Sequence, residues 1–221
     1  MKTLFIVGTD TEVGKTVVTS ALAAYWQTYY PTESLGIMKL IQTGRGDREF
    51  YQQLFPNLEI VNPLCFDTPV APPIAAEREN RSLPLDVVWQ GFSSLQQRKE
   101  LVLVEGMGGL GSPVTWELTV ADIAGEWRLP TILVVPVKLG AIAQTVANIA
   151  LARQKKIDLK GIIFSCPCPL SEQEIADFAP IHLIQSLTQI PVLGMIPYLE
   201  NTQDINKLAH VAANLELEML F

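Results

Sequence analysis

The stretch LFIVGTDTEVGKT, residues 4–16, sets an apolar run directly before a Gly-Lys-Thr sequence. The run at 4–7 is typical of a buried strand, and the segment 16–26 has a helical pattern. A strand, a turn and a helix N-terminus in this order wrap a polyphosphate with backbone N–H groups. We expect Lys15 to reach the β- and γ-phosphates and the Thr16 hydroxyl to hold Mg²⁺.

One position departs from the usual spacing of this motif. The pattern G-x-x-x-x-G-K-S/T places its first glycine where this chain has Thr9, and Gly8 stands one residue earlier. The alternative is a glycine-containing turn with an incidental lysine. Because a strand precedes the motif and a helix follows it, the sequence favours a phosphate loop. We predict nucleotide contacts from Glu12, Val13, Gly14, Lys15, Thr16 and Val17.

The composition predicts one folded domain without a large basic surface. The 221 residues are 48% hydrophobic, and the formal net charge is -7, which argues against nucleic acid or an anionic membrane as the main partner. No apolar run approaches the roughly 20 residues that span a bilayer. The beginning of the chain lacks the pattern of a secretory signal. We therefore expect a cytoplasmic protein.

Cysteine and histidine are too scarce to build the sites that usually depend on them. Cys65, Cys166 and Cys168 fit neither a disulfide framework nor a zinc site. His182 and His210 are the two histidines, and we expect both on helix surfaces or in satisfied polar contacts rather than in a site. This argues against a histidine triad or a histidine-ligated metal and leaves carboxylates, lysines, hydroxyls and backbone dipoles to carry the chemistry.

Short apolar runs alternate with helical patterns along the whole chain. Strands are predicted at 3–7, 35–39, 101–105, 131–136, 161–165 and 192–196, and helices at 16–26, 48–54, 85–98, 120–127, 141–155, 171–187 and 204–217. This alternation predicts a doubly wound α/β fold with a mainly parallel sheet and the topology of P-loop NTPases, as a single domain over 1–221. The proline-rich segment 56–84 is expected to be an irregular surface excursion.

Charged residues follow several of these strands, where parallel sheets bind ligands. Glu105 ends a buried strand, and Asp47 begins a predicted helix, so both are candidate partners of Thr16 at a magnesium site. The alternatives are a capping carboxylate for Glu105 and a simple helix N-cap for Asp47. Lys39 is expected to face the γ-phosphate opposite Lys15. Its alternative is a lysine whose stem leaves the sheet and whose ammonium faces solvent.

Five segments resemble the dethiobiotin synthetase family. Residues 8–16 (GTDTEVGKT) are similar to its phosphate loop, and residues 104–109 (VEGMGG) to its metal-binding glutamate loop. Lys39 with Thr43 resembles the family's lysine and hydroxyl pair. Residues 137–140 (VKLG) and 194–198 (GMIPY) are similar to later family blocks. The resemblance spans nearly the whole chain.

The resemblance implies a reaction that needs ATP and Mg²⁺. CO₂ and 7,8-diaminopelargonate would give dethiobiotin, ADP and phosphate, through a carbamate and then a carbamic-phosphoric anhydride. The substrate supplies both nucleophiles, so the protein has to position the reactants and neutralise charge. The family further implies a homodimer with the substrate site at its interface.

The same resemblance assigns roles by position. Lys15 and Lys39 would be catalytic, and Thr16, Asp47 and Glu105 would hold the metal. The substrate would contact Lys39, Thr11, Thr43, Gly140, Ala141 and Ile142. Nucleotide contacts beyond the phosphate loop would come from Asp47, Glu105, Gly106, Met107, Gly108, Ser165, Cys166, Pro197 and Tyr198. Ser165-Cys166 replaces the family's common Asn-Asp at the base site, so we expect weaker discrimination between ATP and other NTPs.

Two other functions fit a phosphate loop. A ParA/MinD-like switch ATPase would bind a protein partner, but such proteins carry a second lysine where this chain has Asp10. A small-molecule kinase would close an arginine-rich lid, and Arg78 with Arg81 is the nearest approach to one. For the synthetase, we expect substitution of Lys39 to abolish turnover without loss of the fold, on the premise that a strand-end lysine faces solvent.

Overall fold

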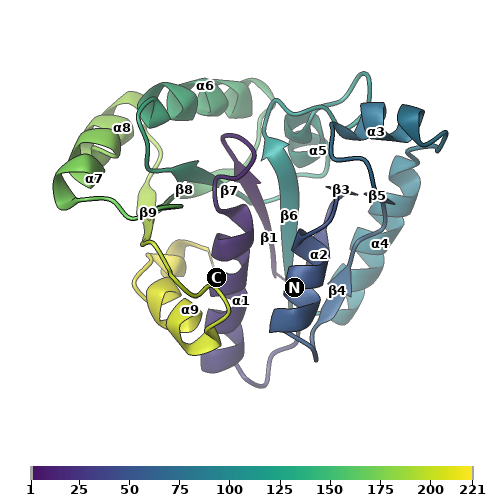
Figure 1. The fold of residues 1–221 in the computed structure, drawn as a ribbon, viewed down its shortest axis with the longest axis horizontal. Helices are drawn as coiled ribbons and strands as arrows, with labels where there is room; N and C mark the ends of the chain where they lie inside the picture. Colours follow the sequence, from purple (N-terminus) through teal and green to yellow (C-terminus); the bar gives the residue numbers. More distant parts are fainter. Residues whose placement is uncertain (1, 221) are drawn as a thin grey trace.

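A seven-stranded parallel sheet runs through the middle of the protein (Figure 1). The computed structural model describes residues 2–220. The strand order is β4-β2-β6-β1-β7-β8-β9, and each neighbouring pair is parallel. The strands are β1 Lys2–Gly8, β2 Leu35–Lys39, β4 Glu59–Val61, β6 Leu101–Gly109, β7 Thr131–Pro136, β8 Leu159–Ser165 and β9 Val192–Ile196. The predicted α/β class and all six predicted strands are confirmed.

Continuous apolar runs form the central strands because both faces of the sheet are covered. Successive side chains of a strand point to opposite faces. In β1, Phe5 and Val7 therefore enter one core cluster, whereas Leu4 and Ile6 enter the other. Both clusters are closed to solvent.

Helices cover the two faces in separate groups. One core contains side chains of α1 Lys15–Tyr29, α2 Asp47–Leu54 and α9 Ile205–Ala212. The other contains side chains of α3 Pro72–Arg78, α4 Leu85–Arg98, α5 Val120–Glu126, α6 Ala141–Gln154, α7 Glu172–Phe178 and α8 Ile181–Thr188. A short 3₁₀ turn, Leu217–Met219, follows α9. Of the helices within residues 2–220, none is both long and apolar enough to cross a membrane.

Three predicted elements are wrong in detail. The helix expected at 171–187 is two helices, α7 and α8, because Pro180 has no N–H and cannot continue a helix interior. The segment 56–84 is not irregular throughout: it contains the edge strand β4, the strand β5 Cys65–Phe66 and α3, whose first residue is Pro72. The helix expected at 204–217 ends at Ala212.

A second, two-stranded sheet was not predicted. Its strands are β3 Gln42–Thr43 and β5, which pair in parallel. Each has two residues, which is too short for a period of two to be recognised in the sequence. This pairing holds the segment between β2 and α2 near the carboxyl end of the large sheet, where the cavity described next lies.

Candidate functional site

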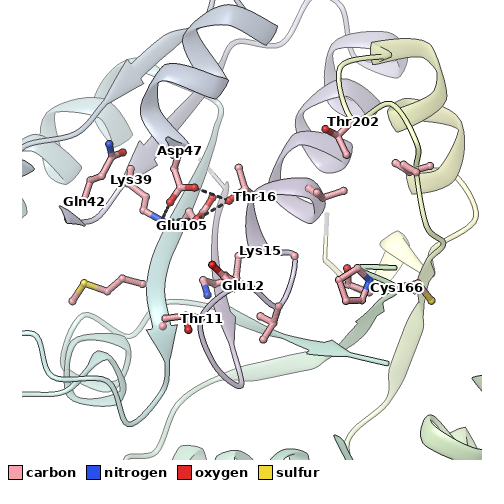
Figure 2. Close-up of a pocket in the computed structure, with 18 of the residues that line it drawn as sticks. Thr11, Glu12, Lys15, Thr16, Lys39, Gln42, Asp47, Glu105, Cys166 and Thr202 are labelled. Carbon is pink, nitrogen blue, oxygen red and sulfur yellow. Dashed lines mark hydrogen bonds and ion pairs between the residues drawn. The ribbon is translucent and has the colours of Figure 1, made fainter. Parts of the chain in front are cut away.

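A cavity of about 530 Å³ opens at the carboxyl ends of the strands, and Figure 2 shows it with its labelled side chains. It brings together most of the predicted site residues from five strand ends. Those on its wall are Thr11, Glu12, Val13, Gly14, Lys15, Thr16, Val17, Lys39, Thr43, Asp47, Glu105, Met107, Gly108, Ser165, Cys166, Pro197 and Tyr198. Further wall residues, which the sequence did not suggest, are Ile41, Gln42, Pro167, Leu199 and Thr202.

Four predicted residues are not on the wall of this cavity. Gly106 lies beside it, and its carbonyl oxygen accepts a hydrogen bond from Lys39 Nζ at 3.3 Å. The start of α6 contains Gly140, Ala141 and Ile142, and it does not contribute to the wall of this cavity. His182 and His210 are exposed on α8 and α9, which confirms their expected places.

The loop at 8–16 arches over the start of α1. Lys15 Nζ donates to the carbonyl oxygen of Asp10 at 2.8 Å, so the lysine closes the loop on itself. A Cβ atom on Gly8 would lie 2.8 Å from that carbonyl oxygen and 3.1 Å from Lys15 Nζ. The strand end therefore needs its glycine at position 8. Thr9 has a negative φ, so position 9 does not require a glycine. This accounts for the unusual spacing of the motif.

Gly14 meets two requirements that another residue would violate. Its φ of 92° lies in the left-handed region, at the N-cap of α1. A Cβ atom there would lie 2.2 Å from Ser165 Oγ. The end of β8 and the phosphate loop therefore lie close together, and both form part of the cavity wall.

Lys39 and Glu105 stand opposite each other on the neighbouring strands β2 and β6. Lys39 Nζ lies 2.6 Å from Glu105 Oε1 and forms a second ion pair with Asp47. The lysine is only 4% exposed. Burial alone would lower the pKa of Lys39, but the two carboxylates outweigh it and raise that pKa. The expectation that Lys39 faces solvent is therefore wrong.

Asp47 is held by side chains and does not cap its helix. The Thr16 hydroxyl lies 3.1 Å from Asp47 Oδ1 and 3.2 Å from Glu105 Oε1. Burial would raise the pKa of Asp47, but the ammonium of Lys39, the Thr16 hydroxyl and the charge of Lys15 together outweigh it and lower that pKa. Glu49 accepts the hydrogen bond from the Gly46 N–H at 3.0 Å and takes the capping role instead. The N-cap alternative for Asp47 is wrong.

The donor set fits a divalent cation of the magnesium class. Side-chain oxygens of three residues lie close together beside the phosphate loop: those of Thr16, Asp47 and Glu105 (Figure 2). Mg²⁺ prefers one or two carboxylates together with waters and phosphate oxygens. Burial lowers the pKa of Lys15 to about 8, and the nearby charge of Lys39 contributes to the shift. An anion that enters the cavity would offset the repulsion between the ammonium groups of Lys15 and Lys39.

The opposite end of the cavity carries few groups that could read a nucleobase. Ser165, Cys166 and Pro167 line it after β8, and Pro197 and Tyr198 line it after β9. The Cys166 Sγ lies 3.6 Å from the Met195 Sδ, and burial raises the pKa of this thiol. Side-chain amides and carboxylates are absent from these five positions.

The sequence of this chain is similar to that of known proteins over its whole length. Residues 2–206 match a family described as "AAA domain". The chain is 76% identical to "ATP-dependent dethiobiotin synthetase BioD" of Crocosphaera subtropica over 221 residues, with 100% of both chains covered. It is 60% identical to the protein of that name from Gloeothece citriformis, with 100% of this chain and 99% of the relative covered.

Solved structures share the fold at low identity. The MinC:MinD cell division protein complex of Aquifex aeolicus aligns with a TM-score of 0.55 and 14% identity, covering 96% of this chain and 86% of the other. A ParA family ATPase from Chlorobium tepidum aligns with a TM-score of 0.56 and 12% identity, covering 99% and 96%. These likenesses confirm the P-loop topology and carry no function. Sequence identity decides the family, and it does not favour the switch-ATPase alternative: this chain belongs to the ATP-dependent dethiobiotin synthetases.

Proposed function

We propose that this protein uses ATP to convert 7,8-diaminopelargonate and CO₂ into dethiobiotin. The observation that carries the proposal is the pair of lysines on the wall of one cavity, Lys15 from the phosphate loop and Lys39 from β2. The charge of Lys39 is near enough to help lower the pKa of Lys15. Two ammonium groups facing one space suit an intermediate that is anionic at both the carbamate and the phosphoryl group. The family membership supports the same reaction.

The proposed steps use nucleophiles from the substrate. One amine adds to CO₂ and loses a proton to give a carbamate. A carbamate oxygen then attacks the γ-phosphorus, and ADP leaves. The second amine attacks the carbonyl carbon of the mixed anhydride, loses a proton, and phosphate leaves as the ring closes. Lys15 and Lys39 neutralise the charge that develops, while Thr11 and Thr43 orient the substrate.

Thr16, Asp47 and Glu105 would hold Mg²⁺, which would neutralise phosphate charge when bound. Lys39 balances the two carboxylates of this set before the nucleotide arrives. The remaining wall residues would contact the nucleotide: Glu12, Val13, Gly14, Val17, Met107, Gly108, Ser165, Cys166, Pro197 and Tyr198. We propose Gly106 as a further contact through its backbone.

We also propose a cytoplasmic homodimer in which a second copy completes the substrate site. The N–H groups at the start of α6 suit the substrate carboxylate, since helix N-termini attract anions. The cavity of the same chain is not lined by Gly140, Ala141 or Ile142, so a partner copy would have to supply these residues.

The test is phosphate release from ATP in the presence of the diamine and ¹³C-bicarbonate. We expect release to require both substrates and Mg²⁺, and the ¹³C label to appear in the ureido carbon by mass spectrometry. A chelator should stop turnover, and added Mg²⁺ should restore it. ATP hydrolysis that ignores the diamine and bicarbonate would instead support a switch ATPase, and phosphorylated diamine without ring closure would support a kinase.

Nucleotide selectivity gives a separate prediction. Because the base end offers no amide or carboxylate side chain, discrimination would depend on backbone groups and shape. A single neutral hydrogen bond contributes about 0.5–1.5 kcal/mol, or roughly tenfold at most. We expect kcat/KM for GTP and CTP to lie within about tenfold of the value for ATP. A preference for ATP above about 100-fold would contradict this reading of Ser165 and Cys166.

A further inference from the structure

Tyr51 lies directly behind the carboxylate of Glu105 and outside the wall of the cavity. It stands on α2, one helical turn after Asp47, and its side chain is fully buried. Its hydroxyl donates a hydrogen bond to Glu105 Oε2. Residues four apart share one face of a helix, so Asp47 and Tyr51 both face β6. Tyr51 can therefore reach the proposed chemistry only through Glu105.

The two oxygens of Glu105 have separate partners. Oε1 faces the site, with Lys39 Nζ at 2.6 Å and the Thr16 hydroxyl at 3.2 Å. Oε2 points away and accepts from Tyr51, which is its one hydrogen-bond donor within residues 2–220. A fully buried carboxylate oxygen without a donor is costly, so Tyr51 fixes which oxygen turns inward.

We propose that Tyr51 is a positioning residue that orients Glu105 for the magnesium–nucleotide complex. The inference rests on the proposed function, in which Glu105 is a metal ligand. Groups that hold a ligand carboxylate from behind typically change metal affinity or activity by about 10–100-fold when removed. The hydrogen bond also fixes α2 against β6 and thereby the position of Asp47.

The test compares Tyr51→Phe with Thr131→Val. Both substitutions remove a fully buried hydroxyl, but the Thr131 hydroxyl donates to the Leu129 carbonyl at the opposite end of the sheet. The affinity for ADP is measured by calorimetry with excess Mg²⁺ and again with EDTA. We expect Tyr51→Phe to reduce the magnesium-dependent gain in affinity by about tenfold, with the EDTA value unchanged. Thr131→Val should leave both values unchanged.

Further readouts separate orientation from general loosening. In turnover assays, kcat of Tyr51→Phe should fall while KM for the diamine stays constant. In a Glu105→Gln background, the same substitution should add no further loss of the magnesium-dependent gain, since Tyr51 acts through that carboxylate. Tyr51→Met also removes the hydroxyl and should give the same result as Tyr51→Phe. It replaces Tyr51→Phe in the test if that variant does not fold.

A folded Tyr51→Phe variant with the wild-type magnesium-dependent gain would overturn the inference and leave the proposed function standing. Equal losses with Mg²⁺ and with EDTA would overturn it as well, because they indicate disturbed packing. If the wild-type protein gained no affinity from Mg²⁺, the proposed metal set itself would be wrong, and the role of Tyr51 would fall with it.

Discussion

Replacing Lys39 with methionine should lower turnover by about 10²–10³-fold, the usual effect of removing one donor that stabilises transition-state charge. Methionine keeps most of the length of the side chain and removes the ammonium group. Affinity for ADP should change far less, since Lys15 remains in the phosphate loop. Steady-state turnover and calorimetric ADP binding measure the two effects. Turnover within tenfold of the wild type would exclude Lys39 from catalysis.

The same variant should also be less stable, contrary to the expectation from sequence. Lys39 is buried between Asp47 and Glu105, and removing one partner of a buried ion pair costs about 3–5 kcal/mol. The free energy of unfolding without nucleotide should fall by about 3 kcal/mol, and Mg²⁺ with ADP should restore part of it. Lys160→Met is the matched control: its ion pair with Asp158 is exposed, so its loss should cost below about 1 kcal/mol.

Replacing Lys15 with methionine should reduce nucleotide affinity by about 10–100-fold and turnover further still. A hydrogen bond to a charged group contributes about 1.5–3 kcal/mol, and Lys15 would donate to the terminal phosphates. Calorimetry with ADP and with a non-hydrolysable ATP analogue measures the loss. We expect the analogue to lose more affinity than ADP, because the γ-phosphate adds contacts to this lysine. Unchanged affinity for both would show that the loop does not bind phosphate.

The lowered pKa of Lys15 gives this prediction a dependence on pH. With a pKa of about 8, roughly half of the lysine is neutral at pH 8 before nucleotide binds. Phosphate favours the charged form, so binding should take up about half a proton at pH 8. Affinity should fall as pH rises through 8. Calorimetry in two buffers of different ionisation enthalpy detects the proton, and Lys15→Met should abolish it.

Stability responds to the same pKa in the opposite sense. The unfolded pKa of 10.5 exceeds the folded value of about 8, so between these pH values the unfolded chain binds more protons. The contribution of Lys15 to the free energy of unfolding of the nucleotide-free protein therefore rises with pH from about 8 to 10.5. Lys15→Met should remove this rise, which chemical denaturation at several pH values can measure.

Periodicity and motif chemistry were sufficient for six of the seven strands of the large sheet and for most of the cavity, whereas the edge strand β4 was missed. The uninterrupted apolar run at 132–135 belongs to a strand covered on both faces, and such strands are recognisable without tertiary knowledge. Lys39 and Glu105 were recognisable because charged residues at the ends of buried strands are costly unless they have a role. Their mutual ion pair was not predicted, since it depends on which strands are neighbours.

Features set by tertiary contacts could not be predicted from the sequence. Tyr51 occupies an ordinary apolar position of a helix, and its hydroxyl partner comes from a strand 54 residues away in sequence. The need for glycine at position 8 arises from the phosphate loop folding back over the strand end, not from the local backbone angle: a Cβ atom there would lie 2.5 Å from Val13 Cγ2 and 2.8 Å from the Asp10 carbonyl oxygen. The break at Pro180 was available from the sequence and should have divided the predicted helix at 171–187.

The pairing of Lys39 with Glu105 has a consequence for how the sheet assembles. If β2 slid along β6 by one residue, Met38 or Leu40 would take the place of the lysine, and the carboxylate would be enclosed without its cation. Such isolation costs several kcal/mol, and the slip would also exchange the two faces of β2. The ion pair between Lys39 and Glu105 therefore favours the correct register of β2 against β6. Selection for turnover and selection for the correct strand register act on these same two positions.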